Sequence, residues 1–170
     1  MQPLVLIVIG SDSDLHVIQS AVKVFEDFEV QYQIRISSAH RLPHKTAQLA
    51  LEAEQKGVEV IIAAAGLAAH LPGVIAAFTT LPVIGVPIKS GALNGQDALY
   101  AIVQMPPGIP VATVAIDGAK NAAILACQIL GIKYPDIRAK LKNYKLELAA
   151  EVEAKDKKLQ EKGVYGYLAT

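Results

Sequence analysis

Short apolar runs alternate with longer segments along the first 130 residues, and this alternation limits the fold more than any other feature of the sequence. The short runs are rich in Val, Ile and Ala, as expected of buried strands, and the longer segments carry apolar residues at helical spacing. Five strand–helix units in succession predict a parallel sheet with helices on both faces. The expected strands are 4–9, 31–36, 58–64, 82–86 and 110–115, and the expected helices are 14–28, 43–56, 72–79, 94–104 and 118–130.

The order of these strands follows from the handedness of their connections. Right-handed crossovers with one reversal give the order 2-1-3-4-5, a three-layer α/β/α arrangement of the flavodoxin-like class. Residues 1–132 are long enough to form this domain with a core of its own. We therefore expect an α/β fold with a five-stranded parallel sheet.

The composition changes after Gly131 and Pro135, where the chain becomes strongly charged. The last 38 residues hold 15 of the 32 charged side chains. Within them, residues 136–162 place apolar side chains three, four or seven positions apart, which predicts an amphipathic helix with a narrow apolar stripe. Residues 133–170 are therefore expected to be a C-terminal helical extension that packs on the oligomer, and two placements stay open: on its own domain, or across to a neighbouring copy of the chain. Residues 163–170 are expected to be unordered unless a partner holds them.

The charge balance indicates which partners to expect. Sixteen Lys and Arg residues match sixteen Asp and Glu residues, so no net field attracts nucleic acid or an anionic membrane. Residues 60–88 carry no charge, but glycines and prolines divide them into pieces far shorter than the ~20 apolar residues of a membrane-spanning helix. Residues 1–132 hold only 17 charged side chains, about 13% against the ~25% usual for soluble domains, so we expect a homo-oligomer whose contacts cover this surface.

The expected compartment is the cytoplasm. No charged segment of a secretion signal precedes the first apolar run. The single cysteine, Cys127, excludes a disulfide within the chain and lies in an apolar helical segment, as a small core residue would.

Polar side chains gather in three loops, each of which begins where an expected strand ends. The first, second and third loops are residues 10–14, 37–43 and 66–73. Because open α/β sheets bind ligands at the carboxyl ends of their strands, these loops are expected to surround one crevice. Two histidines, an arginine, an aspartate and several serines would meet there, as they do in an active site.

The first loop combines hydroxyl groups with two carboxylates. Ser11 and Ser13 stand beside the start of a helix, where anions such as phosphate bind. Asp12 and Asp14 would repel phosphate, and one of them is expected to cap the helix. For Asp14 two interpretations stay open: a helix cap, or an acceptor for two hydroxyls of a ribose.

The second and third loops carry groups that bind anions and move protons. Arg41 has a planar fork suited to phosphate or carboxylate, and the imidazole of His40 can give and take protons at cellular pH. His40 and His44 are four residues apart, but Pro43 lies between them and no third ligand is near, so no metal site is expected. His70 stands among Ala, Leu, Gly and Pro, as a core histidine would, although its place after the third strand favours the crevice.

Seven motifs follow one another along residues 4–130. They are Gly10-Ser-Asp-Ser-Asp14, Ser38-Ala-His-Arg41, Ala68-Ala-His-Leu-Pro-Gly73, Leu81-Pro-Val-Ile-Gly-Val-Pro87, Ala92-Leu-Asn-Gly95, Val103-Gln-Met-Pro106 and Pro110-Val-Ala-Thr-Val-Ala115. Together they closely resemble the PurE family, the N5-carboxyaminoimidazole ribonucleotide mutases of purine biosynthesis. The resemblance implies a flavodoxin-like subunit of a homo-octamer, and an isomerase that uses no metal or organic cofactor.

Carried over by position, the resemblance also implies roles for individual residues. The positions that bind the phosphate and ribose of the substrate are Ser11, Asp14, Ser38 and Arg41. His40 matches the acid–base histidine of the family, His70 matches its second active-site histidine, and residues 89–95 match a loop close to the site. Two departures stand out: Leu67, where glycine is common, is expected to narrow the pocket, and a shortened turn at residues 116–118 is expected to change subunit packing.

The predicted reaction moves a carboxylate from the exocyclic nitrogen to carbon 4 of an aminoimidazole ribonucleotide. It proceeds by decarboxylation and recarboxylation, with histidine as acid and base. The motif at residues 68–73 resembles the mutase branch more than the branch that carboxylates aminoimidazole ribonucleotide with free CO2. Two alternatives stay open: that carboxylase, and a non-catalytic module that binds a nucleotide or a flavin.

Overall fold

The computed structural model describes residues 2–169, and its centre is a five-stranded parallel sheet. The strands are β1 (Val5–Ile9), β2 (Tyr32–Ile36), β3 (Val60–Gly66), β4 (Val83–Ile88) and β5 (Ala112–Thr113). They lie in the order β2-β1-β3-β4-β5. The predicted flavodoxin-like order is confirmed.

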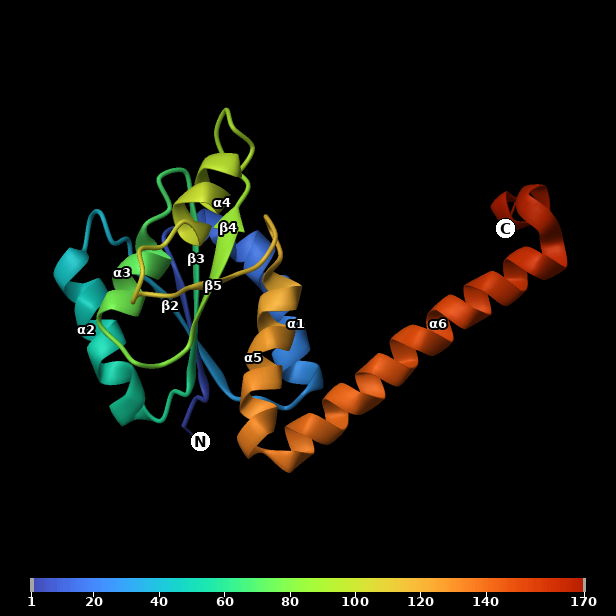
Figure 1. Ribbon diagram of the computed structural model, residues 1–170, viewed down its shortest axis with the longest axis horizontal. Helices are drawn as coiled ribbons and strands as arrows, with labels where there is room; N and C mark the ends of the chain where they lie inside the picture. Colours follow the sequence, from blue (N-terminus) through green and yellow to red (C-terminus); the bar gives the residue numbers. More distant parts are fainter. Residues whose placement is uncertain (1, 170) are drawn as a thin grey trace.

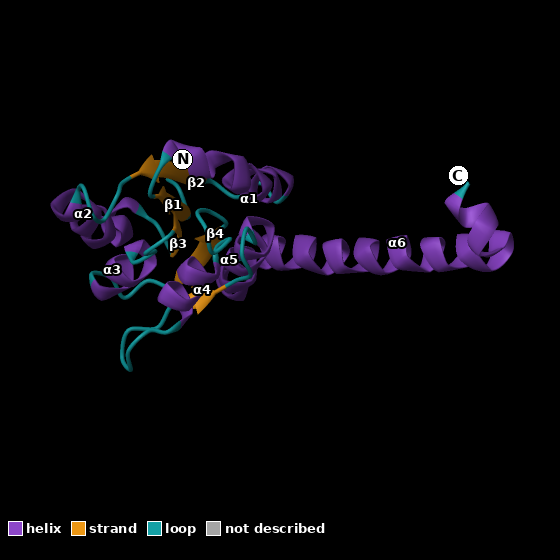
Figure 2. Ribbon diagram, turned by 90° about the horizontal axis from the view of Figure 1, so that it is seen from above, coloured by secondary structure: helices purple, strands orange, loops and turns teal. Residues whose placement is uncertain are grey.

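Helices cover both faces of the sheet and complete the three predicted layers (Figures 1 and 2). On one face, α1 (Leu15–Asp27) and α5 (Ala119–Lys133) share a core with the strands. The other face is covered by α2 (Pro43–Ala53), α3 (Leu71–Ala77) and α4 (Gln96–Val103). Two short 3-10 turns complete the domain: η1 (Asp12–Asp14) precedes α1, and η2 (Glu54–Lys56) follows α2.

The strand β1 supplies both cores with alternate side chains. Val5, Ile7 and Ile9 belong to the core beneath α1 and α5. Leu6 and Val8 belong to the core on the opposite face, and all five side chains are at most 3% exposed. A parallel strand buried on both faces needs apolar residues at every position, which explains the continuous runs in the sequence.

The edge strand β5 is shorter than predicted. A strand was expected over residues 110–115, but only Ala112 and Thr113 pair with β4. Pro110 has no amide hydrogen to donate, and an edge strand has a neighbour on one side only. The bounds of the other elements up to Lys133 lie within three residues of the predicted ones.

The C-terminal helix α6 (Pro135–Leu168) projects away from the domain (Figures 1 and 2). Its first turns follow the predicted apolar stripe, because Ile137 and Leu141 are buried. Farther along the helix, Val152 is 65% exposed. The expectation of an unordered tail was wrong for residues 164–168, which are helical. They follow a break at Gly163, where the φ of 61° suits glycine.

Two further predictions concern the chain as a whole. The predicted division between residues 132 and 133 falls at the end of α5 and stays a prediction. Across residues 2–169, no helix has both the length and the apolar character that crossing a bilayer requires.

Candidate active site

The three polar loops meet at the carboxyl edge of the sheet. They follow β1, β2 and β3, which are neighbours in the sheet. Between them lies a cavity of about 240 Å³. The six residues selected from the sequence all line it: Ser11, Asp14, Ser38, His40, Arg41 and His70. The structure thus brings them together, and their individual roles stay predictions.

The first loop holds Asp14 in a fixed, little-hydrated position. The N-cap of η1 is Ser11, whose hydroxyl accepts a hydrogen bond from the Ser13 amide at 3.4 Å. The expected aspartate, Asp14, stands at the N-cap position of α1, but its side chain makes no capping bond to that helix. Instead, the Asp14 carboxylate accepts from the Ser11 amide at 3.3 Å, which completes a capping box. The Ser13 hydroxyl also donates to Asp14, at 3.3 Å. Asp14 is 7% exposed, and this burial raises the pKa of its carboxyl group, although the hydrogen bonds from the first loop act to lower that pKa.

The position of Asp14 fits both interpretations that the sequence left open, and its role toward a ligand stays a prediction. Its carboxylate caps the first turn, and it also faces the cavity. A carboxylate has about four acceptor positions on its two oxygens, so two local hydrogen bonds leave capacity for the hydroxyl groups of a ligand.

The two histidines of the cavity are in contact. The ring centroids of His40 and His70 are 3.7 Å apart, with an angle of 39° between the ring planes. Desolvation lowers the pKa of His70, and the charge of His40 lowers it further, while the Ala68 backbone opposes the shift. Two imidazolium ions at this distance would repel each other, so the contact disfavours protonation of both rings at once. His70 thus belongs to the crevice and is not an enclosed core histidine.

Arg41 links the second loop to the first. Its guanidinium donates to the Gly10 carbonyl at 3.5 Å, and its backbone amide donates to the Ser38 hydroxyl at 3.3 Å. None of the ion pairs within residues 2–169 involves Arg41. The remaining N–H groups of the fork are therefore available for a phosphate or carboxylate of a ligand.

The loop after β4 supplies a further wall, and Ser90 is its lining residue. A Cβ at Gly66 would lie 2.3 Å from the Ser90 hydroxyl oxygen, so any larger residue there would displace the Ser90 side chain. Leu67 also lines the cavity and has a φ of 55°, a left-handed conformation that strains an L-residue. The Leu67 side chain packs closely on Gly91: a Cβ added to Gly91 would lie only 2.7 Å from the Leu67 Cδ2. Ser90 was not selected from the sequence, although a hydroxyl directly after a parallel strand is the signal that marks the other loops.

No metal centre is evident in the part of the chain that the structure describes, because no three His, Cys, Asp or Glu side chains there are grouped to hold an ion. His44 lies in the first turn of α2 and is exposed. Cys127 is buried in α5, and burial raises the pKa of its thiol to about 12. The prediction of a core cysteine is confirmed.

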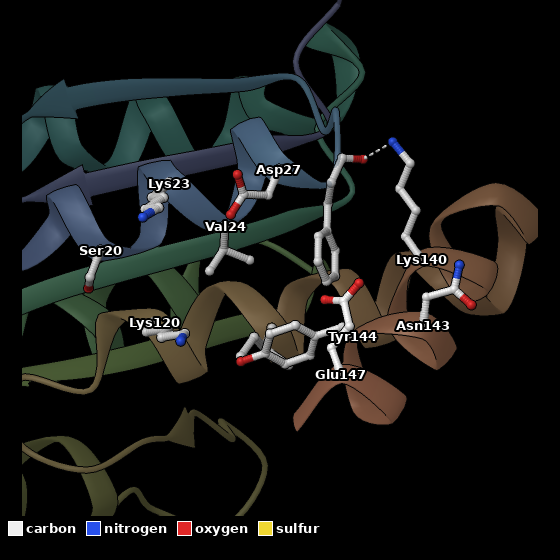
Figure 3. Close-up of a pocket in the computed structure, with 11 residues that line it drawn as sticks. Ser20, Lys23, Val24, Asp27, Lys120, Lys140, Asn143, Tyr144 and Glu147 are labelled. Atoms are coloured by element: carbon white, nitrogen blue, oxygen red, sulfur yellow. Dashed lines mark hydrogen bonds between the residues drawn. The ribbon is translucent and has the colours of Figure 1, made fainter. Parts of the chain in front are cut away.

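A second hollow, of about 470 Å³, lies between α1, α5 and α6 (Figure 3). Lys140 of α6 donates to the Phe28 carbonyl at 3.2 Å and forms an ion pair with Glu29 at 2.6 Å. The Lys120 ammonium is 5.8 Å from the ring centroid of Tyr144. These contacts attach the C-terminal helix to the domain, and the residues that line the hollow include no histidine. The smaller cavity with the two histidines is therefore the candidate active site.

Comparison with known proteins identifies the family. The model of the AIR carboxylase family matches residues 4–151. The chain belongs to this family. It is 60% identical over 168 residues to the N5-carboxyaminoimidazole ribonucleotide mutase of Pyrococcus horikoshii. The aligned residues make up 99% of this chain and 95% of that protein. The mutase of the same name from Thermotoga maritima is 55% identical over 166 residues, 98% of this chain and 97% of that protein.

A solved structure supports the same assignment. The crystal structure of Treponema denticola PurE matches with a TM-score of 0.85 at 31% sequence identity, over 93% of this chain and 99% of that chain. The predicted family and the predicted fold are both confirmed.

Proposed function

We propose that this protein is an N5-carboxyaminoimidazole ribonucleotide mutase of purine biosynthesis. The observation that carries the proposal is the contact between His40 and His70 in a cavity that also holds Arg41 and Asp14. Relatives that match almost the whole chain at 55% and 60% identity bear this name. One cavity combines a proton carrier with groups suited to a ribose phosphate.

The ribose phosphate of the substrate binds to the first and second loops. The fork of Arg41 binds the phosphate, and the hydroxyls of Ser11 and Ser38 add hydrogen bonds. Asp14 accepts hydrogen bonds from the ribose hydroxyls, as acidic residues do in other nucleotide-binding folds. This orientation directs the aminoimidazole ring toward the third loop and its histidine.

The chemistry requires one proton carrier, and His40 takes this role. Protonated His40 gives its proton to the carbamate nitrogen, the bond between that nitrogen and the carboxylate carbon breaks, and CO2 and aminoimidazole ribonucleotide result. Carbon 4 of the ring then attacks CO2 and forms the new carbon–carbon bond. Neutral His40 removes the proton from carbon 4, which restores both the aromatic ring and the imidazolium, so the proton balance closes.

His70 and its apolar neighbours hold the CO2 between the two halves of the reaction. The lowered pKa of His70 keeps its ring neutral, so it hydrogen-bonds to the carboxylate without competing for the proton. Ala68, Ala69 and Leu71 line the adjacent surface. Retaining CO2 beside carbon 4 supplies the proximity advantage of an intramolecular reaction. These steps need proton transfer and containment, and the proposal therefore includes no metal or organic cofactor.

The test is an assay of both candidate substrates with and without added bicarbonate. We expect the N5-carboxylated ribonucleotide to be converted to the 4-carboxylated isomer without bicarbonate. Turnover of aminoimidazole ribonucleotide that depends on bicarbonate would identify a carboxylase that uses free CO2. Binding of the ribonucleotide without any turnover would identify a non-catalytic module.

We also infer that the working form is a homo-oligomer, with an octamer as the form implied by the resemblance to PurE proteins. Large apolar side chains are exposed on several elements; among them, Tyr100 is 62% exposed on α4 and Leu146 is 69% exposed on α6. Apolar surface gathered on a projecting helix fits a contact with further copies of the chain. Light scattering at micromolar concentration should return about eight times the subunit mass of 18.1 kDa. A mass near one subunit would contradict this inference.

The proposed partners are a small ribonucleotide and further copies of the chain. Equal numbers of acidic and basic residues provide no net charge for nucleic acid or a membrane surface. The single buried thiol of Cys127 suits a reducing compartment, so we assign the reaction to the cytoplasm.

A further inference from the structure

The turn between β5 and α5 lies behind the loop that carries Ser90. This turn, residues 116–118, is the one that is shorter in this sequence than is common in PurE proteins. Its middle residue, Asp117, has a φ of 56°, in the left-handed region that L-residues other than Asn and Asp seldom adopt. Strain of this kind persists where neighbouring contacts enforce it. The relevant contacts are with residues 89–95, which we call the β4–α4 loop.

Two hydrogen bonds and one packing contact join the turn to the segment that runs from β4 through the β4–α4 loop. The Asp117 carboxylate accepts from the Lys89 amide at 2.8 Å. The Asp117 amide donates to the Pro87 carbonyl at 2.9 Å. Ile116 packs against the far end of the loop, since a Cβ on Gly95 would lie 2.9 Å from the Ile116 Cγ2. The turn therefore supports the loop at its beginning and at its end.

The opposite side of the β4–α4 loop forms a wall of the candidate active site. Ser90 lines the cavity, and Leu67 from the third loop rests on Gly91. Because the loop has neither helix nor strand of its own, its position depends on such contacts with neighbouring segments. Leu67 holds it on the side of the cavity, and Asp117 holds it from behind.

We propose that Asp117 is a positioning residue for the reaction: by binding the Lys89 amide, it sets the place of Ser90 at the cavity. This inference rests on the proposed mutase activity. Misplacing active-site groups by about 1 Å can cost about 10²-fold in rate, so loss of the contact should lower kcat by about ten- to a hundredfold. The ribose phosphate binds to other loops, so KM should change little.

Asp117→Asn and Asp117→Gly form a matched pair of variants. Both residues tolerate a positive φ, but only asparagine keeps a side-chain oxygen that can accept the Lys89 amide. We expect Asp117→Asn to retain the kcat of the unsubstituted protein and Asp117→Gly to show the loss, with a similar KM in both. A normal kcat in Asp117→Gly would overturn the proposal, and so would equal losses in the two variants.

Amide hydrogen exchange tests the same contact in the unsubstituted protein, so it does not depend on whether a variant folds. The Lys89 amide should exchange far more slowly than the amide of Ala92, which is exposed in the same loop. Equally fast exchange at both residues would overturn the proposal. Absence of mutase turnover in the unsubstituted protein would instead contradict the proposed function, and the exchange result would still stand.

Discussion

Replacing Asp14 by asparagine is expected to weaken ribonucleotide binding about tenfold or more. A hydrogen bond to an ionised acceptor contributes roughly 1.5–3 kcal/mol, against roughly 1 kcal/mol for a neutral pair. Asparagine has one uncharged acceptor oxygen where Asp14 has two charged ones. Losing the charge and one acceptor site should therefore remove at least about 1.4 kcal/mol, a factor of ten in the dissociation constant.

The free energy of unfolding should change much less, because two effects oppose each other. Asparagine keeps one acceptor, so it retains one of the hydrogen bonds from the Ser11 amide and the Ser13 hydroxyl and loses about 1 kcal/mol with the other. It also removes a buried charge. Burial raises the pKa of Asp14 in the folded protein above its ordinary value of 3.8, so ionisation of this group costs stability.

The pH dependence gives the sign of that second effect. Since the folded state holds the proton more tightly, the stability of the unsubstituted protein should fall, relative to Asp14→Asn, as pH rises from 3.8 through the raised pKa. At neutral pH the penalty is complete, and asparagine does not incur it. The control Asp14→Ala loses the hydrogen bonds from the Ser11 amide and the Ser13 hydroxyl and should be less stable by about 1–2 kcal/mol.

The assay combines calorimetric titration with aminoimidazole ribonucleotide and urea unfolding of the same samples. Weak binding with normal stability in Asp14→Asn would establish Asp14 as a ligand for the substrate. Normal affinity in that variant would refute the reasoning and would leave Asp14 with the role of a helix cap alone.

Three further predictions concern the same cavity. His40→Asn should still bind ribonucleotide but lose about 10²- to 10⁴-fold in turnover, measured by single-turnover conversion. His70→Asn should lose less turnover. Loss of turnover in His70→Asn alone would assign the proton transfer to His70. Arg41→Lys should bind ribonucleotide more weakly by calorimetry, because an ammonium lacks the planar fork; an unchanged affinity would place the phosphate elsewhere. Leu67→Gly should be more stable than Leu67→Ala by about 1 kcal/mol in urea unfolding, because only glycine relieves the strain of the positive φ. Equal stabilities of the two variants would show that Leu67 carries no such strain.

The positions of the helices and strands could be predicted because local composition carries them. Val60–Gly66 is apolar throughout because β3 is buried on both faces for most of its length. Pro43 begins α2, and Gly57, with a φ of 84°, ends the segment that includes η2. The edge strand β5 was placed less well, because only two of its residues pair with β4 and its composition does not report how far the pairing extends.

The details of the site could be predicted only in part. Adjacent strand ends placed His40, Arg41 and His70 at one edge of the sheet, and all three line the cavity. The position of the N-cap at Ser11 was missed, because serine and aspartate cap helices about equally well. The hydrogen bond from Lys89 to Asp117 was missed as well, because it joins residues 28 positions apart in different loops.

The sequence by itself determined the class of fold, the order of the helices and strands, and the loops that form the active-site edge. These depend on apolar periodicity and on glycine and proline, which act over a few residues. Only the tertiary structure decided that His40 contacts His70, that Asp14 is both a cap and a cavity residue, and that α6 leaves the domain after its first turns. Such features depend on distances between segments far apart in the chain, and no local pattern of residues encodes those distances.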